Sequence, residues 1–379
     1  MGNLKENSLM KYQFSVPMPD KIEQIKQIKE INDKVEKSVI SNLYFALPIS
    51  CPDNTGFEQL RTNNKTITTI DDYIPIIEET KQKGFEFTYL LNSPKPLLYE
   101  SRFLEQQFEK LDILIQKLQK LECRKFRVGN IHLIDYLTKN YPQLEIFTST
   151  SFEYQTIKQY INLLSFYPNI KEIVPAVDLN KNFKLLKNIK KEFPNLRIEL
   201  MVNEGCIYSC PFRYQHFTSL PYRTENKAYN NKLKSDYFVQ KCNDFSKQNA
   251  LIHLCNHNII YPWEIEEYGK IGIYNFKIAG RDLNEVSRTK HIEYYLSYLL
   301  GIDNLKNIEN EPIRIFNHYI VTTKINYKVK EIKDYLPNIE YFKAHGHLCS
   351  SECGVECNYC CECATKIRNY WGDISLSDI

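Results

Sequence analysis

Residues 125–148 read Lys125-Phe-Arg-Val-Gly-Asn-Ile-His-Leu-Ile-Asp-Tyr-Leu-Thr-Lys-Asn-Tyr-Pro-Gln-Leu-Glu-Ile-Phe-Thr148. Residues 125–128 and 145–148 are short apolar runs, and residues 132–139 between them carry a helical pattern. A helix that connects two strands is typical of a crossover, which makes the two strands parallel. The stretch therefore predicts one strand–helix–strand unit of a parallel sheet.

The same alternation extends from this unit toward both ends of the chain. Eight strands with helical crossovers over roughly 290 residues fit a closed TIM-like (β/α)8 barrel. An open, doubly wound α/β sheet is the alternative, but no glycine-rich phosphate loop follows the first strand. The predicted strands are residues 12–16, 42–47, 85–91, 125–128, 145–148, 172–177, 197–202 and 275–279, and the predicted helices include 99–121, 132–139, 156–166, 183–193, 263–272 and 284–300.

Capping residues predict where two further helices begin. Asp20 precedes Glu23 by three residues, as in a capping box, and an apolar periodic stretch follows. Asp72 can cap a second helix, with Pro75 in its first turn, where the missing N–H costs little. Gly84 suits the left-handed position at the end of that second helix.

The predicted domains are a barrel over residues 10–301 and a C-terminal extension over residues 302–379. The extension is predicted to hold two strands, residues 313–321 and 325–329, followed by a small cysteine-rich tail. The first residues have no apolar run of the signal-peptide kind, and no stretch approaches the roughly 18 apolar residues of a membrane span. We therefore expect a cytoplasmic protein without membrane contact, in a reducing compartment where clustered cysteines indicate metal sites.

The charge balance argues against one class of partner. The chain has 49 lysine and arginine residues against 46 aspartate and glutamate residues. Nucleic-acid binding needs a basic surface, so the sequence gives no strong nucleic-acid signal.

Polar residues follow several predicted strands, at the end of a barrel where active sites form. Taken singly, each is more often a turn or capping residue. Their convergence on one rim favours a site, with Glu204, Arg213, His216, Lys277 and Arg281 as catalytic candidates; a salt-bridged loop is the plainer reading of Glu204, Arg213 and His216. The other rim residues are Cys51, Asn92, Asn130, Ser149, Thr150, Asp178 and Asn203.

Cys206 and Cys210 form the clearest ligand pair. Two thiolates four residues apart can reach one metal from a single turn, and Gly205 frees the backbone to make that turn. Cys242 and Cys255 are the cysteines of the irregular region that follows. Four thiolates suit either structural zinc or a 4Fe–4S cluster, and unligated buried thiols are the alternative. His253 or His257 can replace a cysteine in this set.

The tail predicts a second metal site. Cys349, Cys353, Cys357 and Cys360 can complete it as zinc or a second cluster, with Cys361 and Cys363 as competing ligands. His345 and His347 lie just before them. Residues 353–360 match the cysteine spacing of radical S-adenosylmethionine enzymes, but those enzymes carry it after the first barrel strand, so we read the match as a coincidence.

Two blocks of sequence resemble a known family. Met201-Val-Asn-Glu-Gly-Cys-Ile-Tyr-Ser-Cys-Pro-Phe-Arg-Tyr-Gln-His216 resembles the signature of the collagenase-like peptidase family U32, in a divergent branch with Asn-Glu-Gly-Cys-x3-Cys-Pro-x-Arg-x2-His. Residues 261–281 look like that branch's passage into its last strand, and the cysteine-rich tail is similar to the branch as well.

The resemblance implies a barrel-like fold and a 4Fe–4S cluster. Cys206 and Cys210 carry over by motif, and Cys242 and Cys255 by their order along the chain. Relatives of this kind modify RNA bases or quinone precursors by adding a hydroxyl group without molecular oxygen, and a minority has reported protease activity. We therefore expect an iron–sulfur enzyme that hydroxylates or otherwise modifies a small molecule, an RNA base or a peptide, together with a redox partner protein.

Two alternatives from other classes stay open. A peptidase or peptide-modifying enzyme is the first, although the chain has no His-Glu-x2-His zinc motif and no Gly-x-Ser-x-Gly elbow. A non-catalytic metal module that docks on a partner through its tail is the second.

Overall fold

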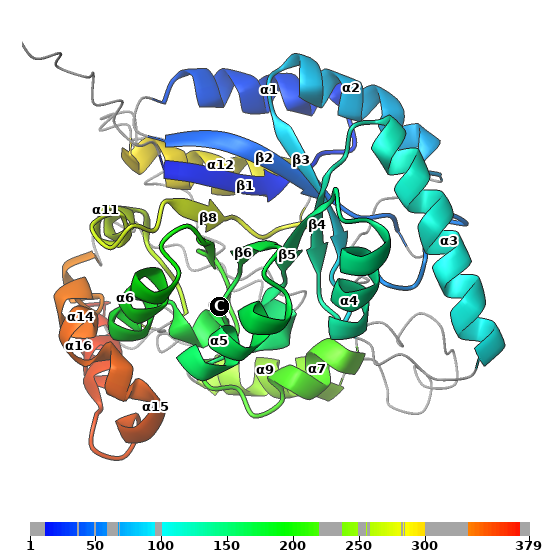
Figure 1. Cartoon of the computed structure of the whole chain (residues 1–379). Helices are drawn as coiled ribbons and strands as arrows, with labels where there is room; N and C mark the ends of the chain where they lie inside the picture. The colour runs from blue at the N-terminus through cyan, green and yellow to red at the C-terminus, as the bar shows by residue number, and fades with distance from the viewer. Residues whose placement is uncertain are drawn as a thin grey trace, which may run out of the picture.

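The computed structural model describes residues 12–35, 38–48, 51–58, 67, 69–94, 101–219, 237–248, 255, 258–281, 283, 285–299 and 333–371. Within them, eight parallel strands close into a barrel in sequence order (Figure 1). Pairing of β1 with β8 closes the ring, as expected from the sequence. The strands are β1 (Tyr12–Pro17), β2 (Ser38–Phe45), β3 (Glu86–Leu91), β4 (Lys125–Val128), β5 (Glu145–Thr148), β6 (Ile170–Ile173), β7 (Arg197–Met201) and β8 (Asn275–Lys277).

Helices connect these strands around the outside of the barrel, and the predicted TIM-like (β/α)8 fold is confirmed. None of the helices in the described ranges is both long and apolar enough to cross a membrane. The helices of the barrel are α1 (Ile22–Asp33), α2 (Ile74–Gln82), α3 (Ser101–Lys120), α4 (Ile131–Asn140), α5 (Ile157–Phe166), α6 (Phe183–Glu192), α7 (Arg213–Ser219), α9 (Tyr237–Gln248), α11 (Ile265–Gly269) and α12 (Glu285–Leu299).

The two predicted helix starts were wrong in detail. Helix α1 begins at Ile22 without a side-chain cap, because Asp20 lies near Arg288 of α12 instead. Helix α2 begins at Ile74 after a 3-10 turn, in which Asp72 accepts a hydrogen bond from the Thr69 amide. Pro75 does lie in the first turn of α2, as predicted. Neither aspartate therefore caps the helix that the sequence pattern assigned to it, because each contacts another residue instead.

Strand boundaries differ most at β2 and β6. Strand β2 begins at Ser38, four residues before the predicted start, and β6 begins at Ile170. The region after Cys210 is also more regular than predicted, since it contains α7 and α9. The predicted strands at residues 313–321 and 325–329 lie outside the described residues.

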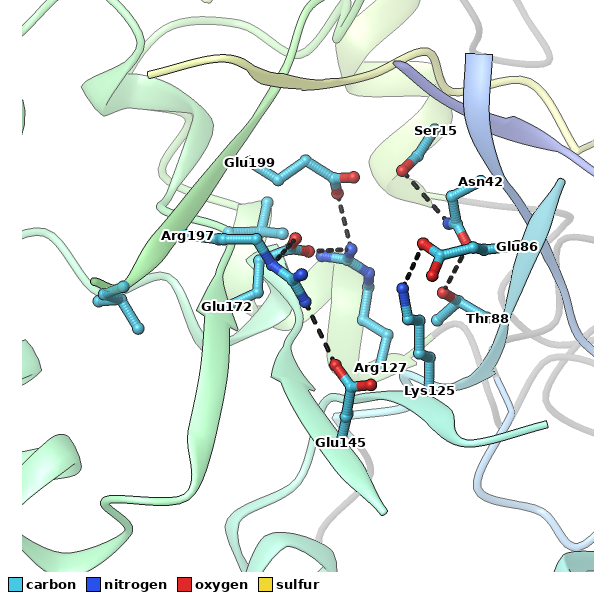
Figure 2. Close-up of polar contacts among 12 residues, drawn as sticks. Ser15, Asn42, Glu86, Thr88, Lys125, Arg127, Glu145, Glu172, Arg197 and Glu199 are labelled. Atoms are coloured by element: carbon cyan, nitrogen blue, oxygen red, sulfur yellow. Dashed lines mark hydrogen bonds and ion pairs between the residues drawn. The ribbon is translucent and has the colours of Figure 1, made fainter. Parts of the chain in front are cut away.

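A network of buried charges occupies the interior of the barrel near its N-terminal end (Figure 2). Arg127 on β4 pairs with Glu172 on β6 at 2.6 Å and with Glu199 on β7 at 2.8 Å. Arg197 on β7 lies 3.4 Å from Glu172 and 3.5 Å from Glu145. The interior at this level is therefore polar, whereas the helices pack on the outer face through the apolar core.

The tail packs as a small helical unit beside α6 (Figure 1). It consists of α14 (Ile339–His345), the 3-10 turn η8 (Gly346–Leu348), α15 (Cys349–Glu352) and α16 (Tyr359–Trp371). The backbone of Gly346 passes so close to the barrel that an added Cβ would lie 2.1 Å from the Lys181 carbonyl oxygen. The Lys181 ammonium forms a buried ion pair with Glu264 and lies 5.2 Å from the Phe342 ring centroid of α14. A charge of the barrel thus lies under the tail.

Candidate functional site

A cavity, called the mouth cavity below, opens where the barrel strands end. The segments that follow β3, β5, β7 and β8 contribute to its wall, as expected for the C-terminal face of this fold. Three of the five predicted catalytic candidates line it. Its polar and charged lining residues are Tyr44, Asn92, Arg127, Ser149, Thr150, Ser151, Glu204, Lys277 and Arg281.

Asn203 fixes the segment that carries Glu204 to the segment after β8. Its side-chain amide donates to the Ala279 carbonyl oxygen at 3.0 Å and accepts from the Ala279 amide at 2.7 Å. Glu204 is almost fully buried, and its Oε1 accepts a hydrogen bond from the Cys206 amide at 3.2 Å. The Glu204 carboxyl group therefore sits between the cavity and the cysteine motif.

Lys277 is the last residue of β8 and a buried lysine of the cavity wall. Its Nζ lies 4.0 Å from the centroid of the Tyr44 ring. Burial holds the pKa of Lys277 well below its ordinary value, and the nearby guanidiniums of Arg127 and Arg281 lower it further. A buried lysine with a lowered pKa in a cavity is a candidate nucleophile or base.

Arg127 reaches the same cavity, and sequence reasoning missed it. It lines both the mouth cavity and a smaller cavity toward the other end of the barrel. A signal did exist in the sequence, because Arg127, Glu172 and Glu199 are charges inside strands that a parallel barrel buries. Charges at such positions must pair with one another, so they indicate an interior network.

Arg213 does not line the cavity but holds the cysteine loop to its surroundings. Its NH1 lies 2.7 Å from Asp178 and 3.4 Å from Glu153, and its NH2 donates to the Ile207 carbonyl oxygen at 2.6 Å. Burial raises the pKa of Glu153 to about 7, against the opposing effect of Arg213. Sequence reasoning missed Glu153, which has no motif of its own.

His216 lies in α7, away from the cavity lining. Its ring stacks on Phe238 of α9 with the centroids 5.5 Å apart. The catalytic role that the sequence suggested for it stays a prediction.

The loop between Cys206 and Cys210 is a tight turn. Ser209 has a positive φ of 52°, and the Cys210 carbonyl oxygen accepts from the Arg213 amide at 3.2 Å. The Cys206 carbonyl oxygen accepts from the side chain of Asn258 at 2.9 Å. Cys206 is buried and Cys210 is half-buried, so the motif presents one thiol inward and one nearer the surface.

The structure places the two remaining cysteines of that predicted set on different elements. Cys242 is half-buried in α9. Cys255 is buried in a small apolar cluster with Tyr261 of the barrel and Cys363 and Ile367 of the tail. Burial raises the pKa of Cys255, and the nearby tail thiols, Cys363 first, raise it further. Cys255 thus faces the tail.

The four predicted tail ligands are electrostatic neighbours of one another. Burial raises the pKa of Cys349 to about 12, and Cys353 and Cys357 raise it further. Burial also raises the pKa of Cys360, with Cys349 and Cys353 as the next causes. Cys353 and Cys357 form an isolated backbone β-bridge across a turn, and both thiols are free. In that turn the Cys357 amide donates to the Glu352 carbonyl oxygen.

The tail thiols also adjoin the loop of the first motif. Tyr208, between Cys206 and Cys210, has a pKa raised by burial and then by Cys349, among other neighbours. In the parts of the chain that the structure describes, no three histidine, cysteine, aspartate or glutamate side chains already form a metal-holding group. The two four-cysteine sets therefore stay predictions.

Several rim residues have structural roles. The Asn130 side chain caps α4 by accepting from the His132 amide, and the Ser149 hydroxyl accepts from the Ser151 amide. Cys51 is buried in the main apolar core. For Asn130 and Ser149, the plainer reading as capping residues is confirmed.

Fold and site together define an α/β-barrel protein with a charged cavity at the C-terminal mouth and a thiol-rich flank. Residues 54–318 match the sequence model of peptidase family U32, so the chain belongs to that family. The resemblance read from the two sequence blocks is thereby confirmed.

The individual proteins that match the chain have low sequence identity to it. An uncharacterized protease of Methanocaldococcus jannaschii, MJ1657, is 23% identical to the chain, and the match covers 93% of this chain and 98% of the relative. The solved U32 peptidase Mk0906 is 13% identical with a TM-score of 0.43, covering 60% of this chain and 87% of that one. An α-amylase from Lactobacillus plantarum is 10% identical with a TM-score of 0.37, covering 89% and 80%.

Proposed function

We propose that this chain is an iron–sulfur enzyme that modifies a substrate bound in the mouth cavity, by oxygen-independent hydroxylation or a related redox reaction. The observation that carries the proposal is that the mouth cavity lies next to the cysteine motif. Glu204 lines the cavity and also accepts a hydrogen bond from the Cys206 amide, so the cavity and the cysteine motif share a wall. A substrate in the cavity would therefore lie beside the thiols.

The donor chemistry suits a cluster. Thiolates are the ligands of 4Fe–4S centres, and the family resemblance assigns Cys206, Cys210, Cys242 and Cys255 to the first one. The tail set, Cys349, Cys353, Cys357 and Cys360, also fits a soft cation, because neighbouring thiolates repel one another unless a cation compensates them. A bound cluster would supply electron transfer, and zinc in the tail would supply structure.

Side chains of this chain provide the remaining functions. The Arg281 guanidinium can bind an anionic group of the substrate, and the buried Glu204 carboxyl group can accept a proton from it. With water as the oxygen source, hydroxylation follows R–H + H2O → R–OH + 2 H⁺ + 2 e⁻. The electrons need an acceptor, for which we propose a redox partner protein.

The proposal is tested on protein purified without oxygen, by counting iron, sulfide and zinc per chain and recording visible absorption and electron paramagnetic resonance. We expect about four irons, or about eight if the tail holds a second cluster. Cys206→Ala and Cys210→Ala should remove the first cluster. Cys123→Ala is the matched control, because Cys123 is a buried core thiol just before β4, whereas the motif follows the C-terminal end of β7. A colourless protein with zinc alone would overturn the iron–sulfur assignment.

A peptidase is the second candidate, favoured by the family description and by the name of the archaeal relative. Among the described residues, the cavity hydroxyls are engaged locally: Thr150 donates to the Pro175 carbonyl oxygen and Ser149 caps a turn. Peptide hydrolysis would therefore use Glu204 or Lys277 as the base for water. Cleavage of an unstructured protein that survives Cys206→Ala but not Glu204→Gln would favour it.

A further inference from the structure

Lys277 is held rigidly and aimed at the mouth cavity. Strand β8 pairs with β1 on one side and β7 on the other, with Lys277 opposite Ser15 and Met201. The Lys277 carbonyl oxygen also accepts a hydrogen bond from the Val202 amide at 3.0 Å. These backbone hydrogen bonds fix the point at which the Lys277 side chain leaves the strand beside the cavity.

The charges around Lys277 come from four segments of the barrel. Arg127 from β4 and Arg281 from the segment after β8 are cations, whereas Glu199 from β7 and Glu172 from β6 are carboxylates. Both carboxylates are already paired with Arg127, at 2.8 and 2.6 Å. Among the described residues, Lys277 therefore meets two guanidiniums, while the two nearby carboxylates are shared with Arg127.

Two effects oppose each other at the amine. The face of the Tyr44 ring favours an ammonium, because the π-electrons attract a cation. Burial and the two guanidiniums disfavour it, and their sum holds the pKa of Lys277 well below the ordinary lysine value. By contrast, an ordinary lysine is uncharged in only about one molecule in 2,500 at pH 7.

Lys181 is a second buried lysine, and a comparison with it shows why the position of Lys277 in the cavity wall matters. It is as deeply buried as Lys277, but its ammonium is paired with the Glu264 carboxylate. It also lies under Phe342 of the tail and does not line the cavity. Burial alone thus gives a structural lysine, whereas Lys277 combines burial with an open cavity and cationic neighbours.

We propose that Lys277 is an imine-forming nucleophile, and that the mouth cavity takes an aldehyde or ketone that carries a carboxylate or phosphate, bound by Arg281. The amine lone pair adds to the carbonyl carbon, a proton moves from nitrogen to oxygen, and the carbinolamine loses water to give the imine. No electrons are gained or lost, and hydrolysis reverses the step.

This inference rests on the proposed function only in taking the mouth cavity as the active site, and it names the substrate class of that site. Imine formation needs no metal. Its failure can therefore be told apart from failure of the iron–sulfur assignment.

The test uses the full chain as purified, with iron counted in the same sample. Glyoxylate and sodium cyanoborohydride are added at pH 7, and the reduced adduct is mapped by peptide mass spectrometry. We expect Lys277 to be modified at least about tenfold faster than Lys125, which pairs with Glu86 at the opposite end of the barrel. Raising the pH from 7 to 9 should accelerate labelling of Lys277 by much less than the roughly hundredfold expected of an ordinary lysine.

Two variants sharpen the result. Lys277→Met should abolish the adduct at this position without a new one elsewhere, and Arg281→Gln should slow labelling by glyoxylate more than labelling by the uncharged glycolaldehyde. If Lys277→Met fails to fold, the Lys277-to-Lys125 ratio in the native chain still decides. Labelling of other lysines with Lys277 untouched would overturn the proposal, whether iron is present or not. Equal slowing of both probes by Arg281→Gln would remove the anionic subsite.

Discussion

Arg127 shows how one side chain can organise the interior of a barrel. Its guanidinium joins the carboxylates of Glu172 and Glu199 from two other strands and reaches both barrel cavities. Because all three groups are buried, each charge depends on the others for compensation. Arg127 also lowers the pKa of Lys277, which burial already holds well below its ordinary value.

Replacing Arg127 with methionine should destabilise the fold strongly. Glu199 would lose its guanidinium partner while buried, whereas Glu172 would keep Arg197 at 3.4 Å. We expect a loss of about 3–5 kcal/mol in the free energy of unfolding, measured with urea. The matched control is Lys125→Met, whose partner Glu86 is 60% exposed, and which should cost at most about 1 kcal/mol. Equal losses in the two variants would contradict this account.

Glu153 makes stability depend on pH in a particular direction. Its pKa in the folded chain is about 7, above the ordinary glutamate value of about 4.3. A raised folded pKa gives a stabilising contribution that is complete below the ordinary value and is lost as the pH rises to about 7. Between pH 5 and 8 the wild type should therefore lose up to roughly 3 kcal/mol relative to Glu153→Gln.

The measurement is the difference between the unfolding free energies of Glu153→Gln and the wild type at each pH. The difference should move in favour of the variant between pH 5 and 7 and become flat above pH 8. A constant difference across the range would show that Glu153 is ionised in the folded chain throughout.

At the scale of elements, the tail is the part that the sequence described least. Its cysteine spacing indicated ligands, but spacing of thiols carries no helix signal, so α14, α15 and α16 were not predicted. The barrel strands were easier, because strands buried on both faces leave apolar runs separated by helical patterns. Asp20 and Asp72 failed as caps for a different reason, since their partners come from contacts that a local pattern does not contain.

Gly346 should be essential for docking the tail. A Cβ at this position would lie 2.1 Å from the Lys181 carbonyl oxygen, so Gly346→Ala must push η8 away from the barrel. We expect a cost of about 1–3 kcal/mol and faster amide hydrogen exchange in α14 and around Cys255. Gly84→Ala is the control, because Gly84 has a positive φ of 77° but an added Cβ there would have no heavy atom within 4 Å. Exchange rates in the tail that match those of the control would refute the contact.

At the scale of the whole molecule, the barrel and the rim could be predicted, and the way its parts meet could not. Parallel strands end at one face, so the sequence order alone brought Glu204, Lys277 and Arg281 to one cavity. Arg213 and His216 lie in a helix after the loop, where their direction depends on packing against Asp178 and Phe238. The attachment of Cys255 to the tail depends on contacts between residues far apart in the chain.

The buried Lys181–Glu264 ion pair makes the barrel depend on its tail. The Phe342 ring of the tail covers a charge that belongs to the barrel, and Cys363 shares an apolar cluster with Cys255. Removing the tail would therefore expose the Lys181–Glu264 ion pair and the Cys255 thiol, which are both buried in the full chain, to solvent. Transplanting the tail onto another barrel would leave its inner face without a complementary cation. The tail and the barrel are therefore better regarded as one structural unit than as interchangeable modules.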